Sequence, residues 1–103
     1  MKIWFGCGNY IISIDDLHSN EYVLKHPIEI TISDHGDEIL AEFTEAGISV
    51  SEDTAVDALQ WLKDSIIDSY VTFNNQRDRL GPIPKRQLQV LEKYIGKEQA
   101  SKG

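Results

Sequence analysis

The clearest pattern along the chain is an alternation of isoleucine with polar residues from Ile28 to Ser33. A period of two residues is typical of a strand with one buried face. The next residues, Asp34-His35-Gly36-Asp37, favour a turn, because Gly36 can adopt a positive φ at little cost. A second apolar-alternating run covers residues 38–44. The pattern therefore predicts a β-hairpin.

The apolar residues also predict the register of this hairpin. With His35-Gly36 as a two-residue loop, all the apolar side chains share one face. The pairs are Ile32 with Ile39, Ile30 with Ala41, and Ile28 with Phe43. The other face then places Glu29 directly opposite Glu42, which is mildly unfavourable. Water, Lys25 or a basic partner would relieve this opposition.

Two further segments have the composition of strands. Residues 47–51 form a third short strand after a turn at Glu45-Ala46-Gly47. Residues 9–14 are also rich in β-branched side chains. This segment has two open placements, as an edge strand of the same sheet or as a strand that pairs across a dimer.

A long amphipathic helix is predicted over residues 54–80. Thr54 can cap its N-terminus, with Asp57 three residues later in a variant of the capping box. Its apolar residues recur at spacings of three and four, as one face of a helix requires. They are Ala55, Leu59, Leu62, Ile66, Tyr70 and Phe73. Gly81-Pro82 then ends the helix.

A second helix is predicted from Pro84 to near Gly96, with Leu88, Leu91 and Ile95 on one face. The first helix would be roughly 39 Å long at ~1.5 Å per residue. It should therefore extend past a sheet of this size, with Tyr70 and Phe73 on the overhang. Either the second helix or a second copy of the chain has to cover that apolar surface.

These elements predict an α+β fold, in which a small antiparallel sheet of three to four strands packs on a long α-helix, followed by a C-terminal helical hairpin. The 103 residues fit one domain, assigned to residues 1–96, with a frayed polar tail over residues 97–103. A domain of this size is only marginally stable alone. We therefore expect a homodimer, in which the helical hairpins pack together.

The charge is divided unevenly along the chain. Residues 1–76 hold 14 acidic and 3 basic side chains, a net charge of −11. Residues 77–103 hold 7 basic and 3 acidic side chains, a net charge of +4. An acidic body repels nucleic acid and favours a basic partner. The basic end can bind a phosphate or the acidic body of the same or another chain, and Arg77, Arg79, Lys85 and Arg86 are its nucleic-acid candidates.

The acidic residues of the predicted hairpin are also candidates for catalysis. Glu29, Glu38 and Glu42 share one strand face in the predicted hairpin. Two-metal nucleases use several carboxylates in this way, but an exposed alternating face accounts for these three, so they are partner-facing candidates. Trp61 lies off the apolar face of its helix, where it either anchors a partner or packs on the N-terminal segment.

No other motif predicts chemistry. Turn formation explains Asp34, His35 and Asp37, which offer too few oxygen ligands for a hard cation. Cys7 lies between two glycines with no histidine at a catalytic spacing. We therefore expect neither catalysis nor a metal or cofactor. The apolar runs are too short for a membrane helix. The acidic pair Asp15-Asp16 follows the apolar N-terminal residues, which is not typical of a signal peptide. We therefore expect a cytoplasmic protein.

Two runs of sequence resemble a known family. The run from Gly36 to Ile48 resembles the second strand and turn of HicB-like antitoxins, and the run from Ser51 to Leu59 resembles the start of their helix. The similarity covers about residues 26–70. It implies a partly RNase-H-like sheet and helix without catalytic acids, used to mask a small RNA-cleaving toxin. The alternative is a stand-alone homodimeric scaffold or regulatory module.

Overall fold

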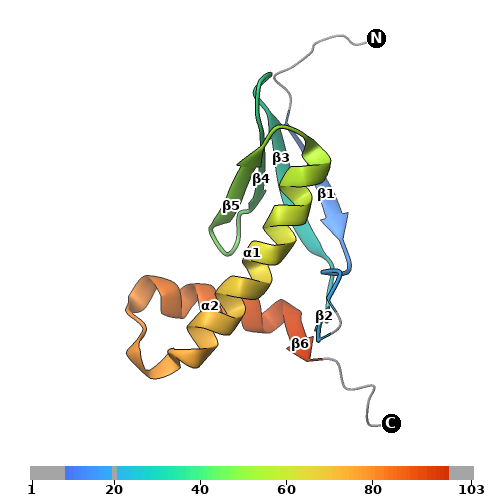
Figure 1. The fold of residues 1–103 in the computed structure, drawn as a ribbon. Coiled ribbons are helices and arrows are strands. Elements are labelled where there is room, and N and C mark those ends of the chain that lie inside the picture. The colour runs from blue at the N-terminus through green and yellow to red at the C-terminus, as the bar shows by residue number, and fades with distance from the viewer. Residues whose placement is uncertain (1–8, 20, 98–103) are drawn as a thin grey trace, which may run out of the picture.

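The computed structural model describes residues 9–19 and 21–97. The strands are β1 (Asn9–Ile14), β2 (Tyr22–Leu24), β3 (Ile28–Asp34), β4 (Ile39–Phe43), β5 (Ile48–Glu52) and β6 (Ile95–Lys97). The helices are α1 (Ala55–Asn75), the short 3₁₀ helix η1 (Arg77–Arg79) and α2 (Pro82–Tyr94). The predicted α+β class is confirmed, with a four-stranded antiparallel sheet packed on a long helix and a second helix after it (Figure 1).

The main sheet has the strand order β1-β3-β4-β5. The segment at residues 9–14, whose placement the sequence left open, is an edge strand that pairs with β3. The alternation predicted for β3 is confirmed, since Ile28, Ile30 and Ile32 are all buried. They form one core with Ala41 and Phe43 of β4 and with Ala58, Leu62 and Ile66 of α1. The helix α1 packs on only this face of the sheet, so the fold has two layers, one of strands and one of helix (Figure 1).

The predicted register of the hairpin is wrong by two residues. Ile32 lies opposite Ala41, and Asp34 lies opposite Ile39, so the loop contains four residues rather than two. The reason is local: Asp34 Oδ1 accepts from the backbone N–H of Gly36 at 2.9 Å, and Gly36 has φ +95°. A shift of two residues preserves the faces, so the apolar residues still share the core side.

The first helix is shorter than predicted, because α1 ends at Asn75 and η1 follows it. Its N-cap is confirmed: Thr54 Oγ1 accepts from the backbone N–H of Asp57 at 3.1 Å. The far half of α1 extends past the sheet, as predicted, and α2 folds back against it (Figure 1). One chain therefore covers the overhang, which removes the reason for expecting the helical hairpins to dimerise.

The C-terminal end was predicted as helix to about Gly96 and as a frayed tail from residue 97. Instead α2 ends at Tyr94, and β6 pairs antiparallel with β2, so that Leu24 lies opposite Ile95. The backbone N–H of Lys25 also donates to the Tyr94 carbonyl at 2.6 Å. Residues 98–103 of the predicted tail lie outside the described residues. None of the described helices is long and apolar enough to cross a membrane.

Candidate functional site

The face of the main sheet that points away from α1 has no covering layer among the described elements. We call it the open face. The alternation of side chains along each strand, together with the strand register, identifies the residues that project from the open face. One row across it contains Ile11, Thr31, Glu42 and Ser49, and Glu29 lies beside Thr31 on β3, opposite Ser13.

The predicted opposition of Glu29 and Glu42 does not exist. Because the register is shifted, Glu42 lies between Thr31 and Ser49, and Glu29 lies opposite Ser13 of β1. Both carboxylates still belong to the open face. Neither makes an ion pair within the described part of the chain. The open face is therefore acidic, and none of the described residues supplies a compensating cation.

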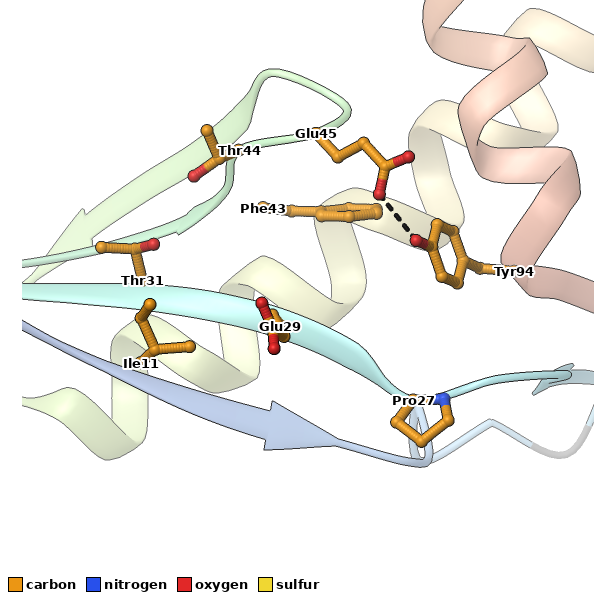
Figure 2. Close-up of a pocket in the computed structure, with 8 residues that line it drawn as sticks. All are labelled: Ile11, Pro27, Glu29, Thr31, Phe43, Thr44, Glu45 and Tyr94. Carbon is orange, nitrogen blue, oxygen red and sulfur yellow. Dashed lines mark hydrogen bonds between the residues drawn. The ribbon is translucent and has the colours of Figure 1, made fainter.

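The open face is hollowed at the end nearest α2. The hollow has a volume of about 510 Å³, and Figure 2 shows the residues that line it. Ile11, Glu29 and Thr31 come from the open face, Pro27 and Thr44 flank the strands, and Phe43, Glu45 and Tyr94 complete the wall. Carboxylates, hydroxyls and aromatic rings thus meet in one concave surface.

Glu45 and Tyr94 are held in a fixed arrangement on one side of this hollow. The Tyr94 hydroxyl donates to Glu45 Oε1 at 2.6 Å (Figure 2). The Lys93 ammonium donates to Oε2 of the same carboxylate at 2.7 Å. The Tyr94 ring also packs edge-on against Phe43, with 5.7 Å between the centroids. These donors, Lys93 first, lower the pKa of Glu45, and the same carboxylate raises the pKa of both Lys93 and Tyr94.

The other two partner-facing candidates lie elsewhere. Glu38 is in the loop after β3, at the end of the hairpin away from the hollow, and not in a strand as predicted. Trp61 is 55% exposed on α1, on the opposite side of the sheet from Glu29 and Glu42. The structure therefore brings Glu29 and Glu42 onto one surface, but it separates them from Trp61. Cys7 lies outside the described residues.

The nucleic-acid candidates are all exposed near the start of α2. Arg77 forms an ion pair with Glu92 and also donates to Asn74, which neutralises part of this basic surface. Lys93 likewise pairs with Glu45 of the same chain. The sequence left open whether the basic end binds a phosphate or an acidic body. The ion pair of Lys93 with Glu45 shows that the basic end contacts the acidic body of its own chain.

Sequence reasoning missed a second polar cluster, in which the buried Lys63 meets the segment after β1. Its ammonium lies 3.4 Å from His18 Nδ1 and 3.7 Å from Asp16 Oδ1. His18 has φ +54°, and its backbone N–H donates to the same Asp16 oxygen at 3.1 Å. The turn is thereby fixed against α1. Within the described residues, no group of three or more His, Cys, Asp and Glu side chains could hold a metal ion.

Comparison of the chain with protein-family models, with curated proteins and with solved structures finds no match in any of the three. The surface chemistry of the open face and its hollow is therefore the basis for a functional proposal.

Proposed function

We propose that this chain is a non-catalytic binding protein of the antitoxin type, whose open face receives a basic protein such as a small RNA-cleaving toxin. One observation carries the proposal. Glu29 and Glu42 project from an uncovered sheet face, beside a hollow of about 510 Å³, and neither has an ion-pair partner in the described part of the chain. The resemblance to HicB-like antitoxins supports the same function.

The chemistry of the hollow suits a cationic side chain. Arginine can bond a carboxylate through two N–H groups, and its flat guanidinium stacks on aromatic rings. The chain already contains a cation beside both a carboxylate and an aromatic ring, since the Lys93 ammonium bonds Glu45 and lies 5.8 Å from the Tyr94 ring centroid. A partner arginine at Glu29 would make a second one on the same wall.

The overall charge supports this function as well. The net charge of −11 over residues 1–76 attracts a basic protein over long range and accelerates its association. Association of this kind weakens as salt screens the charges. The proposal places the protein in the cytoplasm, where a toxin that cleaves RNA would act.

The test is recovery of a partner with matched charge reversals. The tagged chain is purified from its native cells at low and at high salt, as wild type, as Glu29→Lys/Glu42→Lys, and as Asp57→Lys/Asp64→Lys. The last variant makes the same charge change on exposed positions of α1. We expect a basic protein with the wild type and the α1 variant but not with the open-face variant. Absence of a basic protein, or equal recovery with both variants, would contradict the proposal.

A second candidate function is a stand-alone homodimeric scaffold. It is favoured by a different observation: no described strand pairs with the outer edge of β1, where Tyr10 and Ile11 are exposed. A chain that is dimeric and recovers no basic protein would favour this function over the first. The adjacent reading frame distinguishes them too, because a small, strongly basic product is expected only for the antitoxin.

A further inference from the structure

β1 forms one edge of the main sheet. It pairs with β3 along one side, and no described strand pairs with its other side. The backbone N–H and C=O groups along a free edge are a template for a further strand, so natural proteins protect such edges with lysine, proline or bulges. The sequence of β1, Asn9-Tyr10-Ile11-Ile12-Ser13-Ile14, contains no charged residue and no proline.

The exposed side chains of β1 are also apolar. Tyr10 is 50% exposed and Ile11 is 63% exposed, whereas the exposed residues of β5, at the other edge of the sheet, are Ser49 and Ser51. Tyr10 lies opposite Ile32 and so belongs to the core side of the sheet. Ile11 lies opposite Thr31 and belongs to the open face. A strand added here would cover apolar surface on both faces.

We propose that β1 pairs antiparallel with β1 of a second copy, across a two-fold axis at Ile11. The two four-stranded sheets then become one continuous sheet. Directly opposed residues in an antiparallel pair project from the same face. With the axis at Ile11, the two copies of Ile11 face each other, Tyr10 faces Ile12 of the second copy, and Asn9 faces Ser13 of the second copy. Each of these pairs matches apolar with apolar or polar with polar.

Neighbouring registers lose this match. An axis at Tyr10 places Asn9 opposite Ile11, and an axis at Ile12 places Ile11 opposite Ser13. Registers with the axis between residues would oppose Ile11 of the open face to a residue of the core side. A two-fold axis perpendicular to the sheet does not allow this, because opposed residues must project from the same face. The side chains of β1 thus select one self-complementary register, which favours a second copy over an unrelated strand as the occupant.

The pairing also enlarges the open face. A two-fold axis perpendicular to the sheet keeps both open faces on one side, so Glu29 and Glu42 of two copies contribute to one surface. The dimer does not depend on the proposed function, because β1 pairs whether or not a basic protein binds. Each copy carries a net charge of −7, so we expect added salt to strengthen this association, whereas salt weakens binding of a basic partner.

Cysteine cross-linking tests the register. In a Cys7→Ser background, which removes the single natural cysteine, Ile11→Cys places two thiols opposite each other at the axis. Ser13→Cys is the control on the same strand. Its two copies would lie roughly 13 Å apart along the strands at ~3.3 Å per residue, beyond the ~7 Å Cα separation that a disulfide spans. We expect mild oxidation to give disulfide dimers with Ile11→Cys alone, and between Asn9→Cys and Ser13→Cys when these two variants are mixed.

Sedimentation under reducing conditions tests the interface without cross-links. We expect a wild-type dimer at micromolar concentration and a monomer for Ile11→Lys, because two ammonium groups then face each other at the axis. Ile83→Lys makes the same change at a 73%-exposed isoleucine of α2 and should remain dimeric. A wild-type monomer, a dimer that survives Ile11→Lys, or equal oxidation of the Ile11→Cys and Ser13→Cys variants would overturn the inference.

Discussion

The hydroxyl of Tyr94, the last residue of α2, donates a 2.6 Å hydrogen bond to the carboxylate of Glu45, in the turn after β4. These residues are 49 positions apart, and their contact joins the C-terminal helix to the sheet at the hollow. The position of α2 and the shape of the hollow therefore depend on the same hydrogen bond. This dependence can be tested by removing single atoms.

Tyr94→Phe removes the hydroxyl and keeps the ring that packs on Phe43. We expect the free energy of unfolding to fall by about 0.5–1.5 kcal/mol, the usual net contribution of one hydrogen bond. Urea denaturation measures it. Tyr10→Phe is the control, because the Tyr10 hydroxyl has no hydrogen-bond partner among the described residues. Equal effects of the two substitutions would show that the Glu45 bond contributes nothing to stability.

Glu45 also predicts a pH dependence. Lys93 and Tyr94 lower the pKa of Glu45 from its ordinary value of 4.5. Because the folded pKa lies below the unfolded one, this stabilisation is fully present above the unfolded pKa and is lost as the pH falls through the folded pKa. The difference in stability between wild type and Glu45→Gln should therefore be largest near neutral pH and shrink on acidification.

Urea melts of both proteins from neutral to acidic pH measure this difference. The matched control is Glu38→Gln, since Glu38 lies in the hairpin loop and makes no ion pair with the described residues. A Glu45→Gln difference that stays constant across the acidic range would contradict the assigned role of Lys93 and Tyr94.

Ile30 tests the core side of the sheet. Its side chain is 0% exposed, in the middle of β3. Ile30→Asp would bury an unpaired carboxylate there, which should cost more than ~4 kcal/mol and abolish the cooperative thermal transition seen by circular dichroism. Ser51→Asp introduces the same side chain at an exposed position of β5, opposite Leu40, and should change stability by less than ~0.5 kcal/mol. A folded Ile30→Asp protein would refute the assigned faces.

Lys63 offers a test of a buried cation. It is 7% exposed, and Asp16 provides its nearest carboxylate. Lys63→Met removes the buried charge and keeps an unbranched side chain, so we expect a neutral or stabilising effect. Asp16→Asn should destabilise the wild type by roughly 1–2 kcal/mol, less than the ~3–5 of a fully buried pair, because Asp16 is exposed. The same substitution in the Lys63→Met background should cost much less, and equal costs in both backgrounds would exclude a charge interaction.

The local elements were predictable because local chemistry specifies them. The alternating isoleucines of β3 and the Thr54 cap are present as expected. Of the three apolar residues expected on the second helix, Leu88 and Leu91 are buried in α2, whereas Ile95 lies in β6. The hairpin register was not predictable, because alternation specifies the face on which a residue lies but not its partner on the neighbouring strand. A shift of two residues leaves every side chain on the same face. The Asx turn at Asp34 decided between the two registers.

Long-range pairing explains the remaining misses. β2 and β6 are three residues each, too short to show a period, and their pairing joins residues 22–24 to residues 95–97. The hollow likewise depends on the contact between Glu45 and Tyr94, which no spacing in the sequence indicates. Of the predicted partner-facing residues, Glu29 and Glu42 could be placed on one face, because a strand period is sufficient to do so.

The most direct test of the central claim is to locate where a cationic chain binds. The isotopically labelled protein is titrated with a hexa-arginine peptide at physiological salt, and the backbone amide shifts are followed by NMR. If the open face is the binding surface, the largest shifts occur at Glu29, Thr31 and Glu42 and are lost in the Glu29→Lys/Glu42→Lys variant. Largest shifts on the outer surface of α1, around Asp57 and Asp64, would contradict the account.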